Sequence, residues 1–207
     1  SQVGASMIAL ELGYQNLKDN YYNFGFSKPI SVNFPAAAFG LINTKEAVSE
    51  RELASFGYGY GFTVSPFQIT AAYSVFANQG IKKDFKLLMN DEVTSQRVIS
   101  ETSAGHTLEA LEQVVKIGTG KKADIKGFSE GGKTGTVHRT ISGSGYAKDL
   151  YRASFVGIAP LSNESLTIFV SIEDPGLNSY SGGMIAAPLF AKIAESSLNY
   201  LGFIEDE

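Results

Sequence analysis

Cysteine is absent from the sequence, and histidine occurs only twice, at His106 and His138. Without cysteine the chain has no thiol nucleophile and no thiolate metal site, although it is compatible with any redox compartment. Two histidines are too few for a histidine-rich metal centre. We therefore expect neither a metal ion nor a cofactor.

Long apolar runs and basic runs are also missing. No stretch is apolar over the length needed to span a bilayer, and the first residues show no signal-peptide pattern. The formal net charge is -4 and Lys and Arg are not clustered, so we expect no nucleic-acid partner. The chain begins directly in a helical pattern, which we interpret as a piece of a longer protein.

What is present is typical of a folded globular protein. The 207 residues are 43% apolar and 18% charged, a balance that argues against disorder. This length allows one large domain or two small ones and is sufficient to bury a core.

The first 126 residues are dominated by helical patterns and loops. Apolar residues at helical spacing predict helices over Val3–Leu12, about Asn16–Phe24, Ser65–Gly80 and Ser100 to about Ile117. We interpret Gly25–Gly61 as irregular and Lys82–Ile99 as a short hairpin or loop. Within the irregular segment, glycine alternates with aromatics over Phe56–Gly61, which indicates either a tight packing loop or a ligand-lining loop.

After residue 127 the pattern changes to strands. Ala153–Ala159 and Leu166–Ile172 are separated by a short turn and should pair antiparallel. A helix from about Ala187 to Leu201 has Pro188 in its first turn. We predict an α+β fold over residues 1–207, with an antiparallel β-sheet flanked by helices. Helices and loops fill residues 1–126; sheet strands and the last helix fill residues 127–207.

The stretch Gly131–Thr136 concentrates the chemistry of the chain. Lys133 supplies a positive charge, and Thr134 and Thr136 supply hydroxyl donors for an anionic ligand. Gly135, which has no Cβ, allows another backbone to approach closely. This composition predicts a compact site for an anionic, peptide-like ligand.

The segment Gly127–Thr134 also satisfies the G-x-x-x-x-G-K-[ST] expression of a phosphate-binding loop. Such a loop follows a buried strand and begins a helix whose N-terminus holds the phosphates. Here the lead-in Lys121–Lys126 is polar, and the exit Val137–Tyr146 contains β-branched residues followed by glycines and serines. We therefore favour a Lys-Thr-Gly motif on a strand, as found in β-lactamases and penicillin-binding proteins.

Beyond this motif, nearly the whole chain resembles the C-terminal part of the transpeptidase domain of class B penicillin-binding proteins, most closely the septal, cell-division type. The resemblance is carried in order by Val3–Gly13, Tyr58–Gln68, Arg97–Ser100, Gly132–Thr136, Ser154–Pro160 and Gly182–Phe190. It implies the fold shared by β-lactamases and penicillin-binding transpeptidases, of which this chain would be an incomplete, C-terminal portion.

The resemblance implies a peptidoglycan D,D-transpeptidase, in which a serine attacks a D-Ala-D-Ala stem peptide and a second peptide's amine resolves the acyl-enzyme into a cross-link. β-Lactams acylate the same serine. By the family's pattern Lys133 holds the charge network, and Thr134 and Thr136 contact the substrate carboxylate. The Thr136 N–H supplies half of the oxyanion hole, and Gly135 lets the substrate lie along the strand. Tyr180 and Gly182 belong to the region that lines the acyl side-chain pocket.

The sequence also departs from the family. No serine is followed by lysine three residues later, so the S-x-x-K nucleophile is absent from these residues, and we expect the chain alone to be inactive. Ser1 and Gln2 align with the last two positions of the S-x-N element and are a possible remnant of it. Two literal S-x-N matches, Ser31–Asn33 and Ser197–Asn199, lack the family context, and we interpret them as chance.

Two further positions keep alternative interpretations. Tyr180 is followed by Ser181, where the family often has a second aromatic, so Tyr180 is either part of a thinner pocket wall or a packed surface tyrosine. Alternation along the strand puts His138 on the same face as Thr136. A rim role for His138 is conceivable, but a solvated strand position is favoured.

By the same resemblance, the expected partners are peptidoglycan stem peptides, β-lactams and cell-division proteins. The expected location is the periplasmic or extracytoplasmic face of the bacterial inner membrane, with the parent protein anchored by a helix not included here. Exposed apolar faces would favour self-association. The alternative function is a β-lactam sensor or a degenerate penicillin-binding module without catalysis.

Overall fold

The computed structural model describes residues 1–30, 38–42, 45–141, 145–162, 164–176 and 179–206. The chain divides into two compact units. The first comprises Ser1–Ala72 with Lys82–Val98, and the second comprises Tyr73–Ile81 with Ile99–Glu207. Each unit is described by itself.

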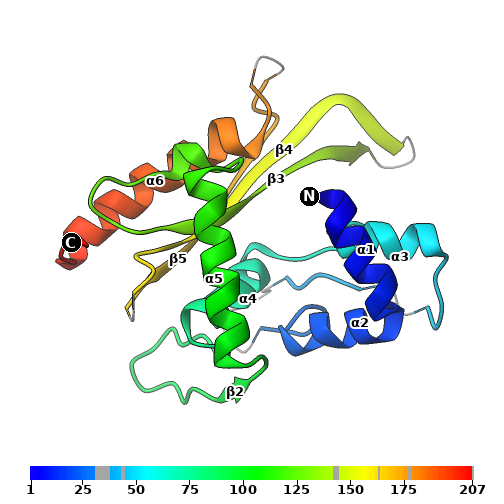
Figure 1. Cartoon of the computed structure of the whole chain (residues 1–207), viewed down its shortest axis with the longest axis horizontal. Coiled ribbons are helices and arrows are strands. Elements are labelled where there is room, and N and C mark those ends of the chain that lie inside the picture. The colour runs from blue at the N-terminus through cyan, green and yellow to red at the C-terminus, as the bar shows by residue number, and fades with distance from the viewer. Residues whose placement is uncertain (31–37, 43–44, 142–144, 163, 177–178, 207) are drawn as a thin grey trace. The chain divides into compact units, whose positions relative to one another are not determined.

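The second unit contains a three-stranded sheet in the order β3–β4–β5, formed by Gly131–Ile141, Gly145–Ala159 and Leu166–Glu173 (Figure 1). Both pairings are antiparallel, which confirms the predicted pairing of the last two strands. The middle strand begins before Ala153, where we had expected it to start. Its polar first half is held in extended form because it pairs with β3, for example at His138 and Tyr151.

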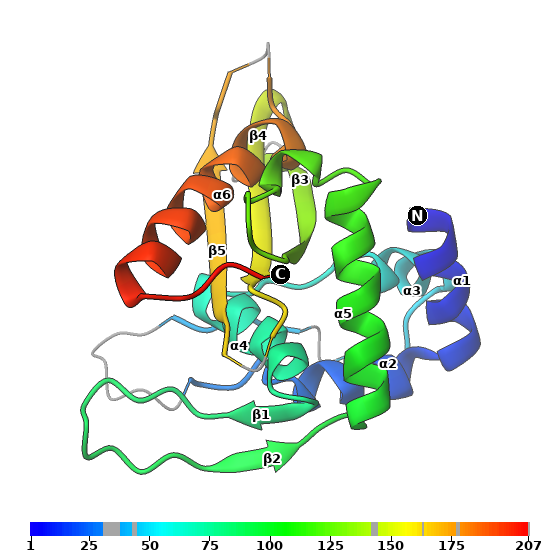
Figure 2. The same ribbon diagram turned by 60° about the vertical axis from the view of Figure 1, so that its left-hand side comes forward.

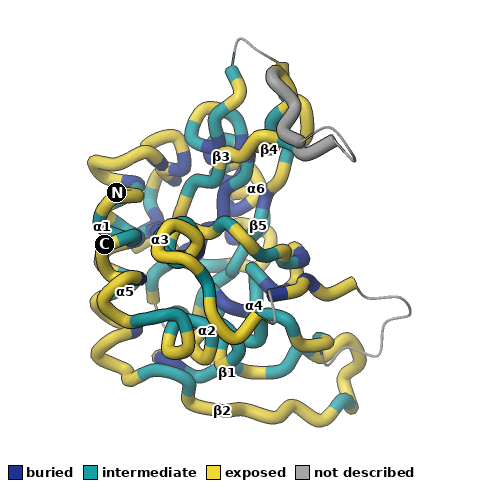
Figure 3. The backbone as a smooth tube through the Cα atoms, turned by 90° about the vertical axis from the view of Figure 1, so that its right-hand side faces the viewer, coloured by how far each residue is buried: buried dark blue, intermediate teal, exposed yellow. Residues whose placement is uncertain are grey.

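Two helices pack against this sheet, α5 (Glu101–Lys116) beside β3 and α6 (Gly182–Leu201) along one face (Figure 2). The rings of Phe155 and Phe190 meet at a centroid distance of 5.0 Å, and both residues are fully buried. The other core residues come from α6, from α5, β4 and β5, and from the segment between α5 and β3 (Figure 3): Val115, Ala123, Ile125, Phe128, Ala159, Val170, Ala186, Ala187, Ala194 and Leu198. The mixed helix and antiparallel sheet architecture is the α+β fold that the sequence predicts.

Helix α6 begins at Gly182, not near Ala187 as expected, and Pro188 therefore lies inside it. Two adjacent glycines are a weak helix signal, because glycine loses much backbone freedom on folding. The early start depends on a contact distant in sequence. The backbone N–H of Gly182 donates to the hydroxyl of Thr136 on β3 at 3.0 Å.

The first unit begins with α1 (Gln2–Leu12) and α2 (Tyr14–Asn23), close to the predicted ranges. A third helix, α3 (Glu50–Gly57), lies in the segment we had interpreted as irregular. Its start is marked by a capping box, in which the Ser49 hydroxyl accepts the Glu52 N–H and the Glu52 carboxylate accepts the Ser49 N–H. That Ser-x-x-Glu signal was present in the sequence and was missed.

Helix α4 (Pro66–Ala77) begins in the first unit, and its last residues belong to the second. The short strands β1 (Ile81–Lys83) and β2 (Ser95–Arg97) then form a two-stranded sheet, as the hairpin interpretation predicted. Around Phe56 the first unit packs ring against ring, with Tyr21 and Phe62 each at a centroid distance of 5.1 Å. This favours the packing-loop interpretation of Phe56–Gly61.

No helix in the described part of the chain combines the length and the apolar character that crossing a membrane requires.

Candidate functional site

The Lys-Thr-Gly stretch lies on β3, where Lys133 is paired with Val156, Gly135 with Ser154 and Thr136 with Ala153. A strand here is incompatible with a phosphate-binding loop, in which the residues after the lysine begin a helix. The nucleotide-binding interpretation of Gly127–Thr134 is therefore rejected.

Two buried glycines bring the start of β3 against its neighbours. A Cβ on Gly132 would lie 2.4 Å from the Phe155 ring, and one on Gly131 would lie 3.0 Å from the backbone of α5 at Leu111. A side chain at either position would push the strand away from the core or from α5. The glycines before Lys133 thus fix the position of the motif by close packing.

The hydroxyls of the motif share one face of the sheet. Side chains two residues apart in a strand point the same way, so Thr134 and Thr136 lie on one face and Lys133 on the other. The Thr134 and Thr119 hydroxyls are 2.8 Å apart, and the Thr136 hydroxyl accepts the Gly182 N–H at the start of α6. Both threonines therefore face the N-terminus of α6.

The N-terminus of α6 is built into this face. Its N-cap residue, Ser181, makes no side-chain capping hydrogen bond, and the Thr136 hydroxyl takes the place of that acceptor. A Cβ on Gly182 would lie 2.3 Å from the Ser154 carbonyl oxygen, and one on Gly183 would lie 2.2 Å from the Thr119 carbonyl oxygen. The glycine pair lets the helix end sit directly on the motif.

Lys133 is on the opposite face of the strand, and its ammonium donates to the Thr134 carbonyl oxygen at 2.9 Å. The residue is exposed as a whole, but partial burial of its ammonium lowers the pKa of Lys133 below the ordinary value. Gly135 shares this face, and a Cβ there would lie 2.4 Å from the Ser154 hydroxyl. A side chain at position 135 would therefore displace the Ser154 hydroxyl from its present place.

A stack of three rings continues the threonine face toward the far end of β3. His138 lies 4.4 Å from Tyr151, and Tyr151 lies 4.3 Å from Tyr180 at an interplanar angle of 22°. Tyr180 is 43% exposed, so one side of the stack is open to a ligand. The structure brings His138 and Tyr180 to the same wall, although they are far apart in sequence.

Sequence reasoning missed three residues at this site: Thr119, Tyr151 and Ser154 as a neighbour of Gly135. Thr119 stands between Gly118 and Gly120 in the turn after α5, and no local pattern connects it with β3. Tyr151 was missed because the first half of β4 was not predicted. An earlier start of that strand would have placed Tyr151 opposite His138.

The remaining predicted positions lie elsewhere. Ser1 is the N-cap of α1 in the first unit, where its hydroxyl accepts the Gly4 N–H at 3.5 Å, and Gln2 begins that helix. Ser197–Asn199 lies inside α6, with Leu198 fully buried, as expected for a chance match. Ser31–Asn33 lies outside the described residues.

Comparison with known proteins gives a consistent result. Residues 1–195 match the family described as penicillin binding protein transpeptidase domain. The probable peptidoglycan D,D-transpeptidase PbpC of Pseudomonas aeruginosa is 34% identical over 208 residues, which cover 100% of this chain and 37% of that protein. The peptidoglycan D,D-transpeptidase FtsI of Buchnera aphidicola is 31% identical over 195 residues, which cover 93% of this chain and 34% of that protein.

Among solved structures, the apo transpeptidase domain of Burkholderia pseudomallei penicillin-binding protein 3 is similar to the whole chain. The TM-score is 0.90 at 34% sequence identity, and the similar region covers 63% of that domain's chain. This chain therefore spans about a third of the length of the curated relatives it matches and less than two thirds of the solved domain.

Proposed function

The chain belongs to the penicillin-binding protein transpeptidase family, and from this membership we propose that β3 and the start of α6 form the carboxylate-binding wall of a peptidoglycan D,D-transpeptidase site. In that reaction a serine hydroxyl attacks the carbonyl carbon between the two D-alanines, and the terminal D-alanine leaves. The amine of a second stem peptide then displaces the serine and forms the cross-link.

The observation that carries the proposal is the arrangement of Thr134 and Thr136 at the N-terminus of α6. Because the Thr136 hydroxyl accepts the Gly182 N–H, its own hydrogen remains available to donate to a ligand. The Thr134 hydroxyl lies 2.8 Å from that of Thr119, and when it accepts from Thr119 it is a second donor on the same face. A substrate carboxylate placed there accepts both bonds, and the positive end of the helix dipole adds to them.

The edge of the sheet supports an oxyanion-binding role for Thr136. The Thr134 carbonyl oxygen accepts from the Lys133 ammonium, which directs that carbonyl away from β4. In an antiparallel pair, residues two apart direct their backbone groups to the same side. The Thr136 N–H is therefore proposed to point from the outer edge of β3 at the developing oxyanion. Lys133, at the same edge, contributes positive charge to the site.

The ring stack is the proposed wall for the substrate's acyl side chain. Tyr180 and Tyr151 offer flat apolar surface, and Gly182, packed closely on the Ser154 carbonyl oxygen, lies next to Thr136. The exposure of Tyr180 favours the pocket-wall interpretation over the packed surface residue. His138, whose ring is tilted by 42° against that of Tyr151, takes a position at the rim.

The nucleophile is the missing part. No serine among the 207 residues has a lysine three positions later, and the groups named above position and stabilise but do not attack. We therefore propose that this chain alone does not form an acyl-enzyme. The absence of this serine from the 207 residues does not distinguish the transpeptidase from the second candidate, a β-lactam sensor or degenerate penicillin-binding module. Ser1 and Gln2 remain proposed remnants of S-x-N.

The relatives suggest where the protein works. PbpC and FtsI are named as peptidoglycan D,D-transpeptidases, so action at the extracytoplasmic face of the bacterial inner membrane is proposed here. Stem peptides, β-lactams and cell-division proteins are the proposed partners, and a membrane anchor on the parent protein is part of the same proposal.

Two measurements test the binding wall. We expect N-acetyl-D-Ala-D-Ala to shift the NMR signals of the Thr134–Thr136 amides with a millimolar Kd, and N-acetyl-L-Ala-L-Ala to shift them less. Thr136→Val, which removes the hydroxyl, should weaken binding by about 10- to 150-fold, because a hydrogen bond to a charged group is worth about 1.5–3 kcal/mol. Thr136→Ser keeps the hydroxyl and is the matched control. Equal binding by the Val and Ser variants would refute the assigned role.

Fluorescent penicillin labelling tests the missing nucleophile. We expect no heat-stable covalent adduct on this chain, because no S-x-x-K serine is present to be acylated. A mass increase equal to one penicillin, located by proteolysis to any serine, would overturn this part of the proposal while leaving the carboxylate wall intact.

Self-association is expected through α1. Its residues Val3, Met7 and Ile8 are between 61% and 69% exposed, which makes an apolar face available to a second copy. The double variant Val3→Lys with Met7→Lys should lower the apparent mass in light scattering at high concentration. If the unchanged chain is already a monomer under those conditions, this expectation is wrong.

A further inference from the structure

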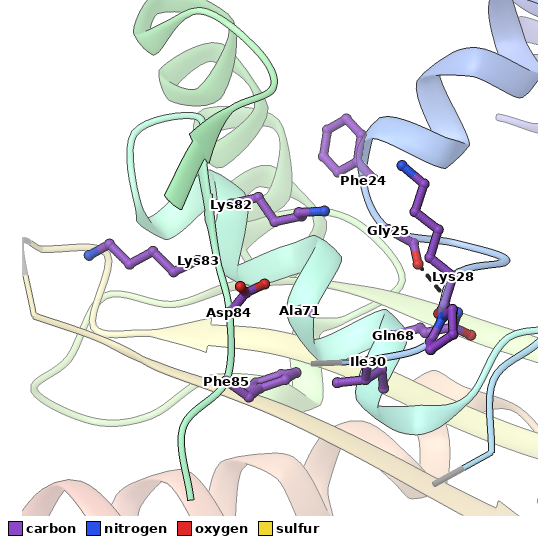
Figure 4. Close-up of a pocket in the computed structure, with 11 residues that line it drawn as sticks. Phe24, Gly25, Lys28, Ile30, Gln68, Ala71, Lys82, Lys83, Asp84 and Phe85 are labelled. Atoms are coloured by element: carbon purple, nitrogen blue, oxygen red, sulfur yellow. Dashed lines mark hydrogen bonds between the residues drawn. The ribbon is translucent and has the colours of Figure 1, made fainter. Parts of the chain in front are cut away.

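The first unit contains a pocket that the proposed transpeptidase site does not use (Figure 4). Its volume is about 110 Å³, and its walls come from the segment after α2, the first turns of α4, and β1 with the residues that follow it. Phe24, Lys28, Ile30, Gln68, Lys82 and Phe85 are the lining residues that determine its chemistry.

The floor of the pocket is held by one side chain. Gln68 is 2% exposed, and its amide oxygen accepts the backbone N–H groups of Gly40 at 2.9 Å and Ser65 at 3.0 Å. Its amide nitrogen donates to the carbonyl oxygens of Gly25 at 3.3 Å and Lys28 at 3.1 Å. Because these hydrogen bonds from Gln68 hold the Gly25–Lys28 segment in place, the pocket is preformed in the absence of a ligand.

The charge of the pocket is opposite to that of the chain. The chain has a net charge of -4, yet Lys28, Lys82 and Lys83 line the pocket against a single carboxylate, Asp84. Lys82 is half-buried, and its ammonium lies beside Gly25, 3.7 Å from where a Cβ on that glycine would be. Within the described residues, neither Lys28 nor Lys82 forms an ion pair, so both ammonium groups are available to a ligand carboxylate.

The lysines differ in direction. In Figure 4 the ammonium groups of Lys82 and Lys28 point toward the region beside Phe24 and Gly25, whereas Lys83 points the opposite way. The carboxylate of Asp84 is engaged by the Thr94 hydroxyl, and its backbone N–H donates to the Thr94 carbonyl oxygen. Asp84 is thereby tied to the chain opposite it in the β1–β2 hairpin.

The rest of the wall is apolar and rigid. Phe85 packs edge-on against Phe67 at a centroid distance of 6.1 Å, and Phe24 and Ile30 complete the apolar lining. The volume is several times the space that one water needs, but it is below the range typical of sites for drug-sized ligands. It therefore suits one side chain or a group of similar size.

Taken together, the charge, lining and size point to one ligand class. We propose that this pocket binds a molecule that carries a carboxylate and an apolar side chain on the same carbon atom, as at the C-terminus of a peptide that ends in an apolar residue. The carboxylate lies between the ammonium groups of Lys28 and Lys82, and the apolar side chain contacts Phe24, Ile30 and Phe85. This site is independent of the Lys133 site and does not rest on the proposed transpeptidase function.

The test uses N-acetyl-L-phenylalanine as the probe and the chain labelled with ¹⁵N. We expect saturable shifts of the Gly25 and Phe85 amide signals with a Kd in the millimolar range, typical of a single small anchor. N-acetyl-L-phenylalanine amide lacks the carboxylate and should give no saturable shift. Inorganic phosphate lacks the apolar group and should bind at least tenfold more weakly.

Three lysine variants make the test specific. Lys82→Met keeps the length of the side chain and removes the charge, and we expect it to raise the Kd at least tenfold. Lys28→Met should act in the same direction, and unchanged amide signals in α1 and α3, which belong to the same unit as the pocket, would show that the fold is retained. Lys83→Met, the matched control on the same strand, should change the Kd less than twofold. Equal Kd values for all three variants, or equal binding of the amide or of phosphate, would overturn the proposal.

Discussion

Different kinds of contact stabilise the interior of each of the two units. In the second unit an apolar core runs between β4 and α6, where Phe155, Phe190 and Leu198 are fully buried. In the first unit the buried apolar residues are few. Rings packed around Phe56 and the hydrogen bonds of one buried amide, Gln68, connect its segments.

This difference explains why the two candidate sites have different architectures. The Lys133 site is fixed by strand register and by glycines that allow close packing, so its groups are placed by the backbone. The pocket beside Lys82 is fixed by side-chain hydrogen bonds from below. A change in the apolar core should therefore affect only the first of these sites, and a change at Gln68 only the second.

The largest effect is expected from Phe190→Ala. Removing a fully buried ring leaves a cavity against Phe155 and should lower the free energy of unfolding by about 3–5 kcal/mol. Tyr200→Ala on the same helix is the control; its side chain is 90% exposed, and we expect a change within about 0.5 kcal/mol. Denaturant unfolding measures both. Equal effects of the two variants would contradict the described core.

A more local effect is expected from Gln68→Leu. The buried N–H groups of Gly40 and Ser65 lose their acceptor, and each unsatisfied group costs about 1–3 kcal/mol, so we expect a total of about 2–6 kcal/mol. Hydrogen exchange should become faster at these two amides and stay unchanged in β3 and β4. Gln68→Glu retains the acceptor oxygen and should protect both amides better than Leu does. Faster exchange throughout the sheet would show that the units are not separately stabilised.

The smallest effect is expected from pH. Burial raises the pKa of Glu130 to about 7, although the Ile125 N–H donates to it. Because folding raises this pKa, Glu130 favours the folded state most below its ordinary pKa of about 4.5, where the carboxyl is protonated in both the folded and the unfolded state. Its contribution is lost as pH rises to about 7, by at most on the order of 3 kcal/mol. Glu130→Gln should remove this dependence and stabilise the second unit at pH 8. If Glu130→Gln and the unchanged chain have the same pH profile of unfolding, the burial of this group is contradicted.

The first unit should respond to pH in the opposite direction. The backbone N–H and hydroxyl of Ser49, followed by Lys45, lower the pKa of Glu52 to about 2. This contribution is present above the ordinary pKa of about 4.5 and is lost as pH falls toward 2. Hydrogen exchange in α3 measured between pH 2 and 5 separates this loss from the change at Glu130.

Local sequence patterns predicted much of the fold. The helices α1, α2 and α5 follow apolar spacing and capping residues, and the pairing of β4 with β5 follows from alternation and a short turn. Helix α3 was missed although its local capping signal was present. Two other errors share one cause. The first half of β4 and the first turn of α6 are locally weak and are stabilised by partners distant in sequence, namely β3 and the Thr136 hydroxyl.

The sequence by itself determined the Lys-Thr-Gly motif, the strand that carries it, the family resemblance and the absence of an S-x-x-K serine, because each depends on residues close together in the chain. Only the tertiary structure decided three groupings. Thr119, Thr136 and Gly182 share one face, and His138 and Tyr180 meet through Tyr151. Lys28 and Lys82 line one pocket. Those groups are joined by strand register, close backbone approach and a single buried amide, and such contacts between distant segments leave no period in the sequence.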